Sequence, residues 1–132
     1  MKVYFADTNI FIRFLLRDNL QQAKEAGNYF ASAKAKKIQI VVLSEILLEI
    51  DYVLKKVYGL SRLEITQKLS DLISSIYFDI KDRSLWIRTI ELYPKTNFDL
   101  VDIFLFEKAK SVEGKVLSFD KDFQKLKRLD NR

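Results

Sequence analysis

Carboxylates are the residues best placed to do chemistry in this sequence, because histidine and cysteine are both absent from its 132 residues. Their absence excludes disulfides, zinc sites built on those residues, and mechanisms that need a thiol nucleophile or an imidazole base. Four acids have an unusual context. Three of them (Asp7, Glu45 and Asp120) follow short β-rich runs, and Asp102 lies inside the apolar sequence VDIFLF. Any catalysis must therefore use carboxylates, hydroxyls, amines or a hard metal ion.

The elements that would position these acids alternate along the chain. Three β-rich runs are KVYFA at the start, IQIVV (38–42) and KVLSF (115–119), and IYFDI (76–80) is a weaker fourth. Segments with helical spacing lie between them, at 19–36, 44–57, 61–75, 84–93 and 99–111. Strands separated by helices need crossover connections. The pattern therefore predicts one α/β domain over residues 1–132, with a mainly parallel sheet in a three-layer α/β/α arrangement.

Such a sheet would gather the acids at one edge, where the carboxyl ends of parallel strands meet and ligands bind. Asp99 and Asp102 are spaced i, i+3 and so share a face at the start of a helix. A carboxylate within the apolar run of Asp102 is costly to bury without a positive partner. A divalent cation turns the repulsion among such acids into coordination, and hard oxygen ligands favour Mg²⁺ or Mn²⁺.

Each acid also has an ordinary structural alternative. Asp7 and Asp99 are suited to be helix N-caps, and Glu45 suits the first turn of its helix. Asp120 is suited to a turn beside Asp122, which we expect to pair with neighbouring lysines. These alternatives explain each residue singly but not their shared location, which favours a metal site.

Polar residues beside the acids are candidates for orienting them. Thr8 follows Asp7, and Ser118 lies two residues before Asp120, so either hydroxyl could hold a carboxylate by hydrogen bonding. Thr8 could equally cap its helix, and Asn9 suits either a site role or an ordinary turn. Glu49, one turn after Glu45, is interpreted as a structural or supporting residue.

The charge balance favours a polyanionic partner. The chain has 23 Lys and Arg against 18 Asp and Glu, a net charge of +5 and a pI near 9.3. Basic residues cluster at Lys34–Lys37, at Lys108 and Lys110, and at Lys121–Arg128, without any single assignment. The start, MKVYFADTN, is too short an apolar stretch for a signal peptide, and no window suits a membrane span. We expect a cytoplasmic protein.

The sequence resembles the PIN-domain nucleases, and among them the VapC-like toxin ribonucleases of toxin–antitoxin pairs. The resemblance rests on FADTNIFIRFLLRD, the ILLE helix that begins at Ser44, FDLVDIFLFEKAK and VLSFDKDF, which occur in the family's order. It implies a parallel sheet of four or five strands and an acidic quartet that binds Mg²⁺ or Mn²⁺: Asp7, Glu45, Asp102 and Asp120. Asp99 would be an auxiliary acid, and Thr8, Asn9 and Ser118 would orient the quartet.

The resemblance also implies an endoribonuclease with an RNA substrate, a cognate antitoxin and a homodimeric state. Apolar residues between Ile10 and Leu16, with Leu47 and Leu48, suggest partner surfaces, although about half of them should simply be core. One alternative is a PIN-like module that binds RNA or protein without cutting. Another is a phosphatase, but the sequence Asp7-Thr8-Asn9 lacks the Asp-x-Asp pattern of phosphoaspartate enzymes.

Overall fold

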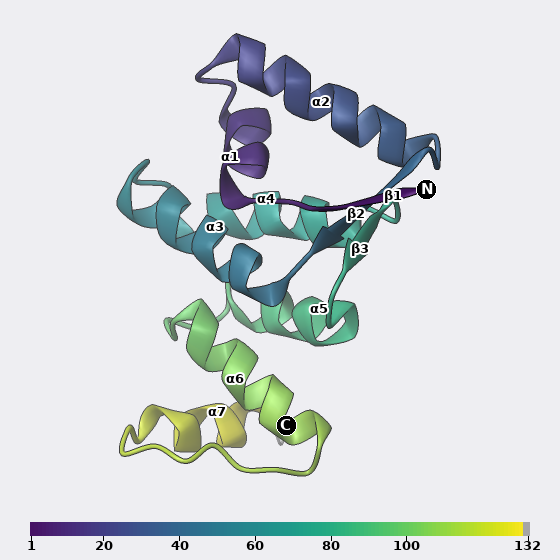
Figure 1. Cartoon of the computed structure of the whole chain (residues 1–132). Coiled ribbons are helices and arrows are strands. Elements are labelled where there is room, and N and C mark those ends of the chain that lie inside the picture. Colours follow the sequence, from purple (N-terminus) through teal and green to yellow (C-terminus); the bar gives the residue numbers. More distant parts are fainter. Residues whose placement is uncertain (131–132) are drawn as a thin grey trace. The chain divides into compact units, whose positions relative to one another are not determined.

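The computed structural model describes residues 1–130 of the chain and divides it into two compact units (Figure 1). The first unit, Met1–Asp82, holds seven elements: β1 (Lys2–Phe5), α1 (Thr8–Leu16), α2 (Leu20–Lys34), β2 (Ile38–Val42), α3 (Ser44–Lys56), α4 (Arg62–Ser74) and β3 (Phe78–Ile80). The second unit begins at Arg83 and holds α5 (Arg83–Leu92), α6 (Leu100–Ser111) and α7 (Asp122–Asp130).

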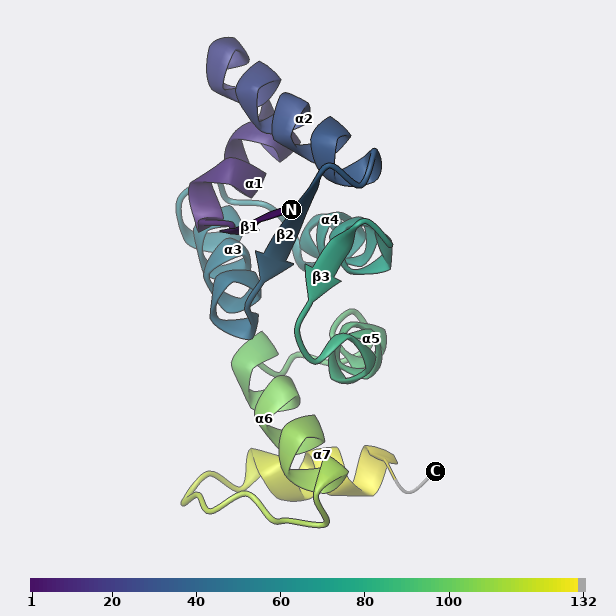
Figure 2. The same cartoon turned by 45° about the vertical axis from the view of Figure 1, so that its right-hand side comes forward.

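The sheet of the first unit is parallel throughout, in the order β1-β2-β3 (Figure 2). Phe5 is paired with Val41, and Val42 with Ile80. Successive side chains of a strand point to opposite faces, yet Ile40, Val41 and Val42 are all buried. Both faces of β2 are therefore covered, which confirms the α/β class and the parallel sheet predicted from the sequence.

The predicted helices are confirmed to within about two residues, because their end signals are local in the sequence. Asn19 accepts a hydrogen bond from the backbone of Gln22, and Ser61 forms a capping box with Glu64. Helix α7 lies outside the predicted helices, since its many charged residues obscure the apolar positions Phe123 and Leu126. No helix of the described residues is long and apolar enough to cross a membrane.

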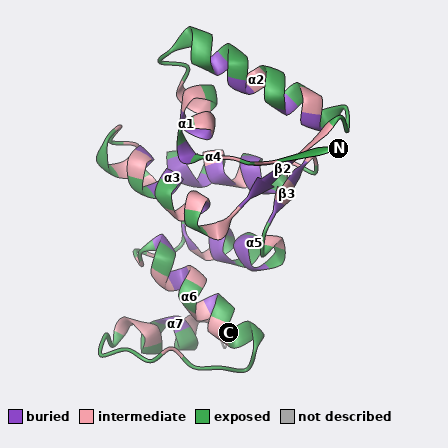
Figure 3. Ribbon diagram, in the orientation of Figure 1, coloured by how far each residue is buried: buried purple, intermediate pink, exposed green. Residues whose placement is uncertain are grey.

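An aromatic cluster holds α1 and α2 to the sheet in the first unit. The ring of Phe30 lies 5.6 Å from Phe11, 4.8 Å from Phe14 and 5.0 Å from Phe78. Figure 3 shows buried residues alternating with exposed ones along α2. Burial of Phe11, Phe30 and Phe78 contributes about 2–3 kcal/mol each, so this cluster stabilises the packing of α1 and α2 on the sheet.

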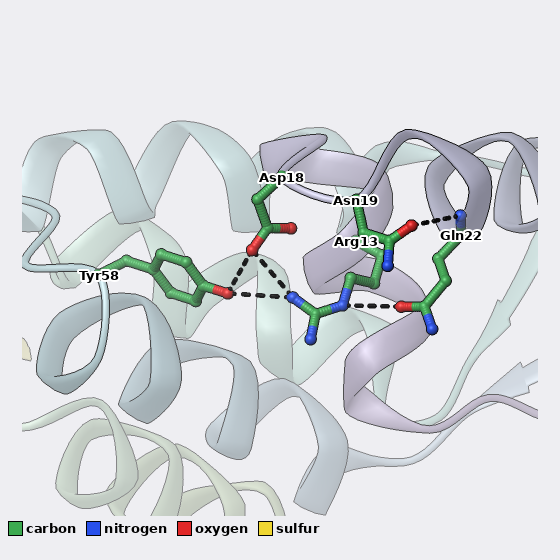
Figure 4. A network of polar contacts seen from close by, with 5 residues as sticks. All are labelled: Arg13, Asp18, Asn19, Gln22 and Tyr58. Carbon is green, nitrogen blue, oxygen red and sulfur yellow. Dashed lines mark hydrogen bonds and ion pairs between the residues drawn. The ribbon is translucent and has the colours of Figure 1, made fainter.

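A polar network holds the turn from α1 to α2 against the end of α3 (Figure 4). Asp18 Oδ2 accepts hydrogen bonds from the Tyr58 hydroxyl at 2.8 Å and from Arg13 Nη1 at 2.9 Å. Arg13 Nε also donates to Gln22 Oε1 at 2.9 Å. These contacts, first of all the one from Tyr58, lower the pKa of Asp18 below its usual value. The network orients α1, whose first residue follows Asp7.

The second unit has its own core around Trp86, which stacks on Phe104 with ring centroids 4.2 Å apart. Beside it, buried Glu107 accepts a hydrogen bond from Arg88 Nε at 3.2 Å. This ion pair joins α5 to α6, and removal of either partner alone would leave a costly unpaired charge. The position of α6 in turn sets the positions of Asp99 and Asp102.

The prediction of a strand at Lys115–Phe119 is wrong for this structure, and so is the expected count of four or five strands. The sheet in residues 1–130 has three strands, and residues 115–119 form none. Leu117 and Phe119 are fully exposed, with relative accessibilities of 102% and 105%. A strand exists only through hydrogen bonds to a neighbour, and this segment has β-rich composition without a ladder partner.

Candidate active site

Two of the predicted acids follow neighbouring parallel strands at the same edge of the sheet. Asp7 comes two residues after β1 and immediately before α1, and Glu45 follows β2 as the second residue of α3. Both side chains are exposed. Asn9 is exposed on the first turn of α1. For this pair the expectation from sheet topology agrees with the structure, because β1 and β2 are paired directly.

Asp7 and Asp99 occupy N-cap positions but do not act as side-chain caps. The backbone of each is extended, with φ −86° and ψ 159° at Asp7 and φ −66° and ψ 146° at Asp99, and neither carboxylate makes a capping hydrogen bond. Asn19 and Ser61, by contrast, make capping bonds of 3.1 and 3.2 Å. The capping role considered for Asp7 and Asp99 is therefore not filled by their side chains. Their carboxylate oxygens are not engaged in capping and are available to a ligand.

Thr8 links the start of α1 to α3 through Glu49. Thr8 is 3% exposed, and its hydroxyl donates a hydrogen bond of 2.7 Å to Glu49 Oε2. Glu49 thus lies beside the residue that follows Asp7, whereas Glu45 lies one turn earlier on α3. The signal in the sequence was the i, i+4 spacing of the two glutamates, which puts both on one helix face. Spacing alone did not indicate which of them contacts the loop after β1.

Asp102 is the acid whose charge is most disfavoured in the described structure. Its pKa is raised above the usual value, first by burial and then by the negative charges of Asp99, Asp120 and Asp122. All four acids belong to the second unit, at the start of α6 and at the approach to α7. The structure therefore places Asp102, the acid with the apolar context, close to three other acids, and the four negative charges repel one another.

The approach to α7 is held by local hydrogen bonds. Ser118 Oγ accepts from the backbone N–H of Asp120 at 2.9 Å, and Asp120 Oδ1 accepts from the backbone N–H of Asp122 at 2.9 Å. Asp122 also pairs with Lys125 at 3.4 Å, as expected from the sequence. Ser118 thus positions the backbone of Asp120. One oxygen of the Asp120 carboxylate stabilises the turn before α7, which is the structural role considered for this residue in the sequence.

The predicted quartet is divided between the two units. Asp7 and Glu45 belong to the first, and Asp102 and Asp120 to the second. Within residues 1–130, no three acidic side chains are arranged as the ligands of one ion. The chemistry of the donors nevertheless fits a hard divalent cation, because they are carboxylate oxygens without nitrogen or sulfur ligands, and the crowding around Asp102 calls for positive charge.

Comparison with known proteins identifies one family. The family model of the PIN domain matches residues 4–129, which include the end of β1, every acid proposed above for the site and nearly all of α7. No curated protein and no solved structure matches the chain. Proteins with a PIN domain are generally metal-dependent nucleases, in agreement with an all-carboxylate site. Because the match extends over nearly the whole sequence, the chain belongs to the PIN domain family.

Proposed function

We propose that this protein is an endoribonuclease that uses Mg²⁺ or Mn²⁺ to hydrolyse phosphodiester bonds in RNA. One observation carries the proposal furthest: Asp102 has a raised pKa because it is partly buried and because Asp99, Asp120 and Asp122 lie close to it. A protein gains no stability from such an arrangement, since each added negative charge opposes the next. The arrangement is useful when a cation and a phosphate occupy the site, which is the chemistry of the family to which the chain belongs.

The residues proposed to hold the cation are Asp7, Glu45, Asp102 and Asp120, with Asp99 as an auxiliary acid. A bound divalent cation would supply positive charge to the scissile phosphate and would lower the pKa of the attacking water. Asn9 and Ser118 are proposed to orient this set, and the Ser118 bond to the backbone of Asp120 supports that role.

The remaining chemistry falls to the side chains of the chain. Without histidine, removal of the proton from the attacking water falls to the cation and to the carboxylates of the site. Thr8 keeps the carboxylate of Glu49 in place through its 2.7 Å hydrogen bond. Loss of such a supporting bond typically lowers activity by about 10–100-fold.

Asp7→Asn and Asp120→Asn test the proposal. Each variant should lose cleavage of single-stranded RNA in Mg²⁺ while keeping or raising its thermal midpoint, because the substitution preserves side-chain shape and relieves repulsion among the carboxylates. The products of the unaltered protein should carry 5′-phosphate and 3′-hydroxyl ends, and EDTA should stop the reaction. Asp71→Asn, on the exposed face of α4, is the matched control and should cut normally. Full activity in EDTA, or cyclic 2′,3′-phosphate ends, would contradict the mechanism.

The same assay separates the two glutamates of α3. Glu45→Gln should lower the cleavage rate because Glu45 is proposed to hold the cation, and Glu49→Gln should lower it because it disturbs the group that Thr8 holds. Normal cleavage by Glu45→Gln would remove Glu45 from the proposed ligands. A non-catalytic binding module, the alternative function, would show no Mg²⁺-dependent cleavage in any of these proteins.

The biological role we propose is that of the toxin in a toxin–antitoxin pair, acting as a homodimer with a cognate antitoxin. Support comes from apolar residues of the first unit: Phe14 is exposed on α1, and Leu15, Leu16 and Leu48 are only partly buried. Ile12 and Leu47 are instead core residues. The exposed members are the ones available to a partner surface.

A further inference from the structure

Two pockets among the described residues of the second unit differ in the charges of their walls. The larger, about 590 Å³, is lined by three lysines but also by Glu113 and Asp130, and Lys110 pairs with Asp130 at 2.6 Å. The smaller, about 420 Å³, is lined by the segment Lys95–Phe98 and by residues of α7. We call the smaller one the Lys95 pocket; its walls are Lys95, Thr96, Asn97, Phe98, Lys125, Arg128 and Leu129.

The walls of the Lys95 pocket carry three cations and no acid. Lys95 and Arg128 are exposed, and within residues 1–130 neither takes part in an ion pair. Among the same residues, Lys125 has only its 3.4 Å contact with the half-buried Asp122. The Thr96 hydroxyl donates to the carbonyl of Leu92 at 3.0 Å, so the donors that remain for a ligand are two ammonium groups, one guanidinium and the Asn97 amide. Such a set suits a phosphate group.

The pocket is joined in sequence to the crowded acids. Phe98 is followed directly by Asp99, the N-cap residue of α6, and Lys125 lies on the same helix as Asp122. A nucleic acid strand at those acids would therefore place a neighbouring backbone phosphate within reach of these cations. We propose that the Lys95 pocket binds a backbone phosphate of the single-stranded RNA substrate next to the cleavage site. This inference rests on the proposed function and adds the residues that hold the strand.

Binding measured without cleavage tests the pocket. Fluorescence anisotropy in EDTA would follow a labelled single-stranded RNA of about 12 nucleotides as it binds. The double variant Lys95→Gln/Arg128→Gln should weaken binding about tenfold or more. It should also lower the slope of log K against log salt by about 0.7 for the phosphate contact that is lost. Lys24→Gln/Lys56→Gln, at two exposed lysines of α2 and α3, removes the same charge and should change binding by about twofold or less.

Equal weakening in both double variants would overturn the inference, since it would mean that net charge alone binds RNA. Unchanged binding in the Lys95/Arg128 variant would overturn it as well. Both results are distinguishable from failure of the proposed function, which is measured separately as Mg²⁺-dependent cleavage by the unaltered protein. Thermal midpoints of the two variants should match that of the parent, because the four replaced side chains are exposed.

Discussion

At the scale of single residues, activity and stability make opposite demands on Asp102. Burial and the charges of Asp99, Asp120 and Asp122 raise its pKa, so the folded protein holds a proton on this carboxyl more tightly than the unfolded chain does. A group of this kind adds stability when it is protonated and subtracts stability when it is charged. At neutral pH the folded protein therefore bears a cost at this position, which is typical of functional sites.

Asp102→Asn should raise the thermal midpoint at about pH 7, because the amide carries no charge to be repelled. The advantage over the parent protein should shrink as pH falls through the raised pKa of Asp102, where the parent becomes protonated at this position, and should be smallest near about pH 4. Thermal unfolding of both proteins across this pH range measures the difference. Asp71→Asn, on the exposed face of α4, is the control for the substitution itself. A destabilised Asp102→Asn protein at neutral pH would contradict the account.

At the scale of elements, β2 and the segment 115–119 show that β-rich composition is not enough to make a strand. Both are short runs rich in β-branched and aromatic residues, but β2 is paired on both sides, with β1 and β3. The segment 115–119 has no ladder within residues 1–130, and its apolar side chains at Leu117 and Phe119 are in solvent. Strand propensity describes how well side chains fit a half-buried surface, so it fails where no surface is provided.

Hydrogen exchange should separate these two segments. Backbone amides of Leu117 and Phe119 should exchange at close to the rates of an unstructured peptide, because no ladder protects them. Amides of β2 should exchange only on global unfolding, which costs about 5–15 kcal/mol in ordinary domains. Strong protection at 115–119 would show that the segment pairs as a strand. Dependence of that protection on protein concentration would locate the pairing between copies of the chain.

At the scale of the whole molecule, charge and exposed apolar surface both point to partners. The net charge of +5 favours polyanions, and the first unit leaves large apolar residues in solvent on β1, α1 and α2. These properties are global, since no single residue sets them. The net charge supports the RNA substrate proposed above, and the exposed apolar residues support the proposed protein partners.

Light scattering should give a particle of twice the 15.6 kDa chain mass if the N-terminal helices form the proposed dimer. Leu20→Lys, at the 71% exposed first residue of α2, should shift the population toward the monomer because it places a charge in the apolar contact. Val57→Lys, at the 68% exposed end of α3, is the matched control and should leave the mass unchanged. A strictly monomeric parent protein at high concentration would contradict the dimer.

The sequence by itself determined six of the seven described helices, all but α7, and the three strands of the sheet, because the signals for these elements lie within a few residues of one another. Asn19 and Ser61 cap the helices that begin directly after them, and the run IQIVV coincides with β2. It also determined the chemical type of the site: without histidine or cysteine, only carboxylates remain to bind a metal. The apolar context of Asp102 indicated a carboxyl with a perturbed charge, and the structure bears this out.

Only the tertiary structure decided which partners these residues meet. Thr8 contacts Glu49 across 41 positions of sequence, and Lys95 lines a pocket with Arg128, although no local pattern links either pair. Tertiary structure also left the segment 115–119 without a ladder, which its composition did not foretell. The physical reason is common to all three cases: periodicity and capping depend on near neighbours in the chain, whereas contacts at long range depend on how buried faces pack.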